Sequence, residues 1–287
     1  MTTQAVRDAG LDKFYTIPEI SQKCIELTGT LYPWNSWALV VEPSAGNGSF
    51  LTKIPLMPPY RLGIDISPEH PEIQKQDFLT YTPSHAIGLG DRRILVIGNP
   101  PFGKVSSLAV KFFNHAAKWA SVIAFIIPRT FRRISLQNKL DTKFHLIHDI
   151  DIPTKPCSFQ PPMMVKCCFQ IWEKKDVIRA RVTLPSYHDH WDFLDLGPLD
   201  TQGQPTVPQG ADFVIRAYGG KCGEIARENL SSLRPKSWHW IKCKIDISLL
   251  VRRFEALDYS ISKDTARQNS IGRGELIQLY TDSLSNM

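Results

Sequence analysis

The chain has 287 residues, of which 43% are hydrophobic and 22% charged. A chain of this length and composition can bury a sizeable core, which argues against a disordered protein. No apolar run is long enough to span a bilayer, and the segment MTTQAVRDAG lacks the basic start and apolar stretch of a signal peptide. We therefore expect an intracellular protein without a membrane partner, cytoplasmic in a prokaryote or virus, with the nucleus left open for a eukaryote.

The cysteines and the charges indicate which kinds of ligand the chain can bind. The six cysteines form no C-x-x-C pair and have no matching histidine spacing, so we expect core cysteines and no metal site. The net charge is +6, but residues 102–187 alone carry 14 basic and 5 acidic side chains, a net charge of +9. Such an excess fits a polyanion lying over this part of the chain, or solvated helix faces.

Apolar periodicity predicts an α/β architecture. Short unbroken apolar runs predict buried strands at residues 37–41, 60–66, 94–97, 122–127, 144–152 and 165–172. Helical patterns lie at residues 18–31 and 108–120. This alternation predicts a doubly wound, mostly parallel sheet, in which ligands bind at the carboxyl ends of the strands.

The character of the chain changes near residue 185. Residues 186–211 include LGPLDTQGQPTVPQGA, which predicts a linker or a long loop. Strand patterns in DFVIRAYGGKCG and SWHWIKCKI and a helical pattern at residues 247–257 then predict a small α+β extension over residues 212–287. Its tryptophans and nearby basic residues fit either core packing or a grip on nucleic acid.

A glycine-containing segment follows the first predicted strand. EPSAGNGSF places Glu42 at the strand end, and Gly46 and Gly48 allow a tight turn and a close approach of the backbone to a ligand. Taken alone, this pattern also fits a structural turn.

Two further acids stand at the next strand ends. Asp65 ends the run at residues 60–66, where an acid can accept hydrogen bonds from both hydroxyls of a ribose. Asp77 and Phe78, in QKQDFLTY, suit an adenine ring through a hydrogen bond to its amino group and an apolar contact. Each acid alone could be a helix cap, but three acids in these loops favour a nucleotide-like ligand.

The segment VIGNPPFG, residues 96–103, ends an apolar run with an amide, two prolines and an aromatic residue. Two successive prolines cannot continue a strand ladder or a helix. The sequence therefore predicts a rigid shelf after the strand at residues 94–97, with Asn99 at its start.

The combination of EPSAGNGSF, GIDIS, QDFL and GNPPF closely resembles S-adenosylmethionine-dependent methyltransferases that methylate adenine N6 in nucleic acids. FYTIP, residues 14–18, resembles their aromatic-x-T-P element, with Ile17 inserted before the proline. The order of these elements resembles the gamma arrangement of DNA adenine-N6 methyltransferases. The resemblance covers roughly residues 13–175 and implies a Rossmann-like methyltransferase fold, with residues 1–185 as the catalytic domain.

The resemblance also implies a set of site residues. The cofactor S-adenosylmethionine would be bound by Tyr15, Thr16, Glu42, Ser44, Ala45, Gly46, Gly48, Asp65, Ile66, Asp77, Phe78 and Asn99. The catalytic residues would be Asn99, Pro100, Pro101 and Phe102.

The shelf fits the chemistry of such a reaction. An exocyclic amine is a poor nucleophile because its lone pair is delocalised into the ring. The side-chain oxygen of Asn99 and the carbonyl oxygen of Pro100 can accept both amino hydrogens, so that the lone pair points at the methyl group. Phe102 would stack on the base, which must be flipped out of a duplex or unpaired.

The resemblance and the basic excess suggest further contacts to substrate. Phe159 would supply a second aromatic wall for the base, or else anchor a buried loop. Arg129, Arg132 and Arg133, in IIPRTFRR, would contact phosphates, or else lie on a solvated helix start.

Several related functions stay open at this point. NPPF also occurs in adenine methyltransferases of structured or cap-proximal RNA and in guanine-N2 methyltransferases of ribosomal RNA, whereas glutamine-N5 protein methyltransferases more usually have Tyr at the fourth position. A methyltransferase fold that only binds RNA or protein is a further alternative, although the intact Asn99 and the three acids argue against it. We expect nucleic acid as the substrate, with DNA favoured over RNA. The extension is short for a domain that reads sequence, which leaves room for a partner subunit.

Overall fold

The computed structural model describes residues 13–83 and 93–285 and divides the chain into two compact units, Met1–Arg181 and Val182–Met287. The division falls four residues before the end of the predicted catalytic domain. None of the helices described combines the length and apolar character needed to cross a membrane.

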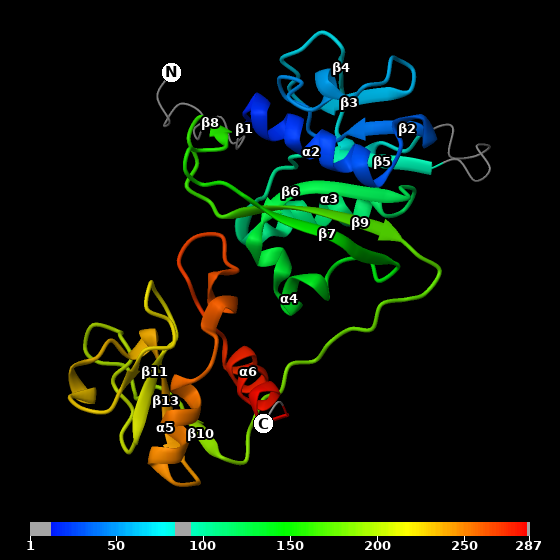
Figure 1. Cartoon of the computed structure of the whole chain (residues 1–287). Helices are drawn as coiled ribbons and strands as arrows, with labels where there is room; N and C mark the ends of the chain where they lie inside the picture. Colours follow the sequence, from blue (N-terminus) through cyan, green and yellow to red (C-terminus); the bar gives the residue numbers. More distant parts are fainter. Residues whose placement is uncertain (1–12, 84–92, 286–287) are drawn as a thin grey trace. The chain divides into compact units, whose positions relative to one another are not determined.

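A seven-stranded sheet forms the centre of the N-terminal unit (Figure 1). Its strands are β2 (Trp37–Glu42), β3 (Arg61–Asp65), β4 (Ile73–Lys75), β5 (Arg93–Gly98), β6 (Val122–Pro128), β7 (Phe144–Ile152) and β9 (Cys167–Lys174). They lie in the order β4-β3-β2-β5-β6-β9-β7, parallel except for β9, which is antiparallel to both of its neighbours. This order confirms the predicted Rossmann-like, mostly parallel sheet.

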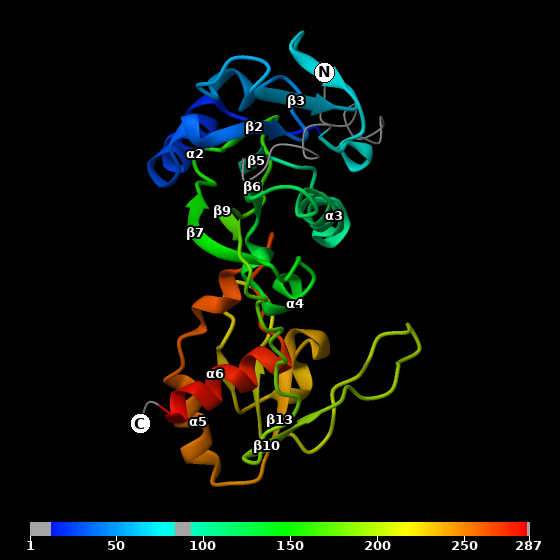
Figure 2. The same cartoon turned by 90° about the vertical axis from the view of Figure 1, so that its right-hand side faces the viewer.

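The central strands are buried because helices cover both faces of the sheet. All seven residues of β6 are buried. The helices α2 (Pro18–Leu31) and α3 (Ser107–Ala116) lie on opposite sides of the sheet (Figure 2). The predicted bounds of α2 are confirmed, whereas α3 ends four residues early because the chain turns at 117–121 to enter β6. A short helix, α4 (Ile134–Gln137), follows β6.

A two-stranded ribbon ties the N-terminal segment to the loop between β7 and β9. In it, β1 (Tyr15–Thr16) pairs antiparallel with β8 (Phe159–Gln160). The inserted Ile17 donates its N–H to the Ser158 carbonyl at 3.0 Å, and Pro18 then starts α2. The insertion is thus the link between the ribbon and the helix.

A four-stranded antiparallel sheet forms the C-terminal unit. Its strands, in sheet order, are β10 (Trp191–Leu194), β13 (Trp238–Cys243), β11 (Phe213–Arg216) and β12 (Ile225–Ala226). The helices α5 (Ile247–Glu255) and α6 (Arg273–Ser285) share one apolar core with this sheet. The structure confirms that the C-terminal extension has the predicted α+β class.

One prediction for this unit is wrong. Residues 186–211 are not only a linker or loop, because β10 lies within them and pairs with β13 along its whole length. The strand has four residues, and its flanks are rich in Asp, Gly and Pro, so its own sequence resembles a loop. Its partner lies almost fifty residues further along the chain.

Candidate active site at the carboxyl edge of the parallel sheet

The predicted site residues follow neighbouring strands. Glu42 ends β2, Asp65 ends β3, Asp77 follows β4 and Asn99 follows β5. Since these four strands are parallel neighbours, their carboxyl ends meet at one edge of the sheet. The structure therefore brings the four loops together.

The glycine loop is held in place by Asp65. Gly46 and Gly48 have φ angles of +51° and +82°, a region that favours glycine. The Asp65 carboxylate accepts the N–H of Gly46 at 2.8 Å through Oδ2 and the N–H of Ser67 at 2.7 Å through Oδ1. Each oxygen has a second lone pair, so Asp65 is fixed in position and can still accept hydrogen bonds from a ligand.

Tyr15 packs on the glycine loop. A Cβ atom added to Gly46 would lie 2.5 Å from Cε1 of Tyr15, so any larger residue would displace the ring. The Tyr15 hydroxyl donates to Oε1 of Glu69 at 2.6 Å, and Lys13 Nζ donates to the same oxygen at 2.8 Å. Burial, followed by the Glu69 contact, raises the pKa of Tyr15, which therefore stays a neutral phenol.

Glu42 is buried beneath the loop. Its carboxyl group accepts the N–H of Leu51 at 2.7 Å and the N–H of Phe50 at 3.4 Å, and so caps the short 3-10 helix Leu51–Lys53. Burial raises the pKa of Glu42 to about 8, against the opposing effect of these two hydrogen bonds. The neighbouring Ser44 is half-buried and Ala45 is buried.

The amide of Asn99 is only partly hydrogen-bonded. Its Nδ2 donates to the carbonyl of Phe14 at 3.1 Å, which ties the shelf to the segment before β1. Its Oδ1 is buried and accepts no hydrogen bond from any described residue, and the same holds for Oγ1 of Thr16. Buried polar atoms are nearly always paired. Two unpaired acceptors in the predicted cofactor and catalytic segments therefore mark a place where a ligand can donate.

The rest of the shelf leads into α3. Pro100 is buried, while Pro101 and Phe102 are half-buried. The Phe102 carbonyl accepts the N–H groups of Leu108 and Ala109 at 3.2 and 3.3 Å, so the shelf also caps the start of α3.

A strained segment follows the shelf, and no sequence pattern predicts it. Val105 and Ser106 have φ angles of 53° and 60°, in the left-handed region, which is rare for a β-branched residue such as valine. The Val105 side chain is 80% exposed. Such strain collects at functional sites, but valine and serine give no sequence signal for it.

After β4, the two residues that the sequence predicts to contact adenine together, Asp77 and Phe78, differ in burial. Asp77 is exposed and accepts the N–H of Leu79 at 2.9 Å, as the cap of the 3-10 helix Phe78–Thr80. Phe78 is 1% exposed and stacks on Phe112 with ring centroids 5.1 Å apart, so it belongs to the core and has no free face for adenine. Ile66, after β3, is 51% exposed and offers an apolar surface at this edge.

The predicted phosphate-binding arginines are engaged within the unit. Arg129 pairs with Asp151 at 2.7 Å, and Arg132 pairs with Asp151 at 2.9 Å and donates from Nε to Asp149 at 3.0 Å. Arg133 is 9% exposed. Arg129 and Arg132 are paired because alternate residues of β7, Asp149 and Asp151, present carboxylates to the segment after β6, and phosphate contact stays a prediction.

Phe159 lies in β8 directly opposite Thr16. Its side chain is 3% exposed, so it anchors the loop and does not present a free aromatic wall. The structure favours the second of the two alternatives for this residue.

The described residues include no group of three or more His, Cys, Asp or Glu side chains placed to hold a metal ion. The cysteines are free thiols, and burial raises the pKa of Cys24 and Cys167.

The chain matches no protein-family model, and no curated protein matches it. Its fold is similar to that of several solved structures. A Listeria monocytogenes protein assigned as a class I S-adenosylmethionine-dependent methyltransferase has 15% identity and a TM-score of 0.44, and the match covers 58% of this chain and 64% of that one. The chain thus spans less than two thirds of that protein.

Two further structures are named for RNA methylation. The 23S rRNA methyltransferase ErmE has 16% identity and a TM-score of 0.41, with 58% of this chain and 71% of that chain covered. A Pyrococcus horikoshii protein assigned as an RNA methyltransferase has 16% identity and a TM-score of 0.42, with 57% and 88% covered. These sequence identities and TM-scores are too low to assign a substrate to this chain. The fold assignment depends on the strand order described above.

Proposed function

We propose that this chain is an S-adenosylmethionine-dependent methyltransferase that transfers a methyl group to N6 of a flipped-out adenine in DNA. The observation that carries the proposal is the buried Oδ1 of Asn99, which accepts no hydrogen bond from the described residues. Leaving a buried acceptor unpaired is costly, and an amine that donates to it removes the cost.

The cofactor fits the residues at the sheet edge. The glycine loop leaves no room for a side chain at Gly46 beneath Tyr15, and Asp65 retains lone pairs for the two hydroxyls of a ribose. Thr16 adds a buried hydroxyl without a partner among the described residues. When bound, S-adenosylmethionine supplies a methyl group attached to a positively charged sulfur.

The hydrogen bond from Asn99 Nδ2 to the Phe14 carbonyl sets the orientation of the amide. Because Nδ2 is held at that carbonyl, a flip of the amide would place two oxygen acceptors against each other. Oδ1 is therefore committed to receive an N–H group.

The amide and the shelf together hold the amine for reaction. Oδ1 of Asn99 accepts one hydrogen of the adenine amine and the carbonyl of Pro100 accepts the other, which favours a tetrahedral nitrogen. Held in this way by Asn99 and Pro100, the nitrogen would bond to the methyl group that bound S-adenosylmethionine would supply, with the electron pair of the broken sulfur–carbon bond left on the departing thioether. The surplus proton passes to water, since neither acceptor is basic enough to hold it.

The order of the sequence elements supports DNA as the substrate, because it resembles the gamma arrangement of DNA adenine-N6 methyltransferases. RNA is the second candidate, and the experiment separates the two. The full chain is incubated with methyl-labelled S-adenosylmethionine and either duplex DNA, single-stranded DNA or RNA at matched salt, and the nucleosides are identified by mass spectrometry. Labelled N6-methyladenine from DNA is expected. Label in RNA adenine alone would overturn the DNA assignment, and label on guanine N2 or on protein would overturn the proposal.

A further inference from the structure

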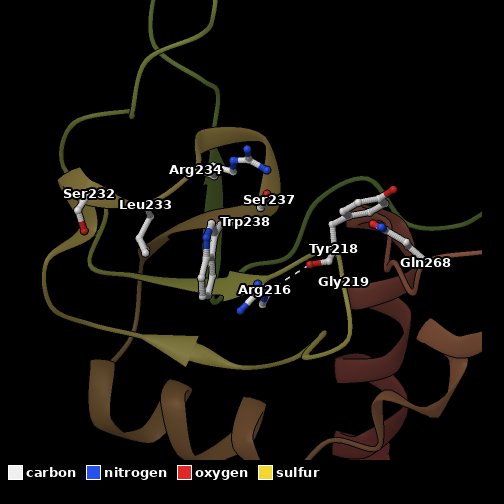
Figure 3. A pocket seen from close by; sticks show the side chains of 9 residues that line it. All are labelled: Arg216, Tyr218, Gly219, Ser232, Leu233, Arg234, Ser237, Trp238 and Gln268. Atoms are coloured by element: carbon white, nitrogen blue, oxygen red, sulfur yellow. Dashed lines mark hydrogen bonds between the residues drawn. The ribbon is translucent and has the colours of Figure 1, made fainter.

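The C-terminal unit contains an open pocket with a volume of about 400 Å³ (Figure 3), within the range typical of small-molecule sites. It is lined by Arg216, Tyr218, Gly219, Ser232, Leu233, Arg234, Ser237, Trp238 and Gln268. None of these nine residues is acidic, and two are arginines. The residues come from the end of β11 and the turn after it, from the start of β13 and the segment before it, and from the segment before α6, so the fold assembles the pocket from distant parts of the chain.

Backbone hydrogen bonds fix one side of the pocket. The turn after β11 reaches Gly219, whose φ of +100° favours glycine and whose N–H donates to the Asn269 carbonyl at 2.9 Å. Tyr218 also forms an isolated β-bridge with Ser270. The aromatic ring of Tyr218, 48% exposed, is therefore attached to an ordered turn although it faces solvent.

Trp238 differs from the other tryptophans of this unit. Trp191 and Trp240 are 1% exposed and belong to the core, whereas Trp238 is half-buried and lines the pocket. The guanidinium of Arg216 lies over the Trp238 ring, with Cζ 5.4 Å from the ring centroid. Arg216 is itself held by Glu224 at 2.9 Å and by the Tyr218 carbonyl at 3.4 Å. Arg216 thus covers one face of the Trp238 ring and holds it in place.

Arg234 supplies a cation that no described residue pairs with. It is exposed, and its side chain forms no ion pair or hydrogen bond with the residues that the structure describes. Glu224, the acid beside Arg216, is already neutralised by that arginine and by Lys221. A ligand at this pocket therefore meets a net positive charge, an aromatic platform and the amide of Gln268.

We propose that this pocket binds one nucleotide of a single-stranded stretch of nucleic acid, with its base against Trp238 and Tyr218 and its phosphate at Arg234. A bare anion would use only the arginine, and an apolar ligand would find Leu233 as the one aliphatic side chain among the lining residues. Aromatic stacking together with a cation is the chemistry of single-strand recognition. The inference rests on the proposed function, because it supplies a second contact to the same substrate.

The test measures binding without methyl transfer. Fluorescein-labelled single-stranded DNA of about ten nucleotides, within the site sizes of such modules, is titrated with the full chain in the absence of S-adenosylmethionine and followed by fluorescence anisotropy. Tyr218→Ala is expected to weaken binding by about 5- to 150-fold. Arg234→Ala is expected to weaken it and to reduce the slope of log K against log salt by about 1.

Two variants serve as controls. Arg252→Ala removes an exposed arginine on α5 that does not line the pocket, and it is expected to leave the affinity unchanged. Trp238→Phe keeps an aromatic face and is expected to retain most of the affinity that Trp238→Ala loses. Equal losses in Arg234→Ala and Arg252→Ala would overturn the proposal, as would full affinity in Tyr218→Ala.

Competition identifies the ligand class. Adenosine monophosphate is expected to displace the oligonucleotide at concentrations where inorganic phosphate and polyglutamate do not. Displacement by phosphate or polyglutamate to the same extent would overturn the nucleotide assignment. Because no methyl transfer is measured, a chain that binds DNA through this pocket but methylates nothing would refute the proposed function and leave this inference standing.

Discussion

The arginines of the two units differ in what surrounds them. In the N-terminal unit, Arg129 and Arg132 face the carboxylates of Asp149 and Asp151 on β7. In the C-terminal unit, Arg234 is exposed with no partner among the described residues. The arginines that the sequence singled out for phosphate contact are thus paired within their own unit, whereas Arg234 is not. Local pairing has to be considered beside the charge count when cations are assigned to a polyanion.

The aromatic residues show the same contrast. Phe78 and Phe159 of the N-terminal unit are buried, whereas Tyr218 and Trp238 of the C-terminal unit line an open pocket. The N-terminal unit offers fixed acceptors for chemistry at the sheet edge, while the C-terminal unit offers aromatic and cationic surface. This division predicts that substitutions in the N-terminal unit affect catalysis, cofactor binding or folding. Substitutions in the pocket of the C-terminal unit are predicted to affect the affinity for nucleic acid.

The largest effect is expected from Asn99→Ala. The variant loses the acceptor that the amine needs most when its nitrogen becomes tetrahedral, so turnover should fall by about 100-fold or more. Cofactor affinity, measured by calorimetry, should change little. Asn35→Ala, at an exposed position of the 3-10 helix Trp34–Ser36, is the matched control and should keep full activity. Unchanged turnover in Asn99→Ala would break the assignment of catalysis to the shelf.

Asp65→Ala is expected to have a smaller effect, which concerns the affinity for the cofactor. The variant removes a charged acceptor for the ribose and the anchor of the Gly46 and Ser67 N–H groups. Cofactor binding should weaken by roughly 1.5–3 kcal/mol, the range for hydrogen bonds to a charged group. Calorimetry on the full chain checks this. An unchanged dissociation constant would show that the cofactor does not use this edge as proposed.

Arg132→Ala sharpens the contrast between the arginines. It leaves Asp149 and Asp151 without this partner, so we expect the free energy of unfolding to fall by about 1–3 kcal/mol. The affinity for single-stranded DNA should stay near that of the unsubstituted chain, in contrast to Arg234→Ala. Urea denaturation and anisotropy check the two quantities separately. Lost DNA affinity at full stability would restore Arg132 as a phosphate contact.

The last prediction concerns pH and Glu42. Its pKa is raised to about 8 in the folded chain by burial, above the ordinary value of about 4.3 for an unfolded chain. The folded chain therefore holds an extra proton between these values, and this contribution to stability is present below about pH 4 and lost as pH rises through 8. Glu42→Gln keeps the acceptor for Leu51 and should flatten the decline in unfolding free energy between pH 5 and about 8. An identical decline in the variant would contradict the raised pKa.

Much of the fold could be predicted because its signals are local. The strands β5 and β6 are unbroken apolar runs, and α2 starts at a proline and keeps its apolar residues at helical spacing. The strand β10 could not be predicted, since its four residues become a strand only through pairing with β13. The helix α6 also escaped prediction.

The candidate site, like the fold, could be predicted only in part from the sequence. The positions of Asp65 and Asn99 at strand ends follow from the sequence, because the backbone of a parallel sheet fixes them. The burial of Phe78 and the pairing of Arg132 do not follow, because they depend on which side chains of α3 and β7 the fold brings near. The pocket of the C-terminal unit unites segments about 50 residues apart, and no motif in the sequence marks it.

The proposed function depends on Oδ1 of Asn99 accepting a hydrogen of the adenine amine. A crystal structure of the full chain with S-adenosylhomocysteine, the demethylated cofactor, and an adenine-containing oligonucleotide measures this directly. We predict an adenine N6 within about 2.7–3.2 Å of Asn99 Oδ1, the range of an N–H···O hydrogen bond, with Nδ2 still bonded to the Phe14 carbonyl. An adenine bound elsewhere, or an Asn99 Oδ1 paired with a group of the protein itself, would contradict the account.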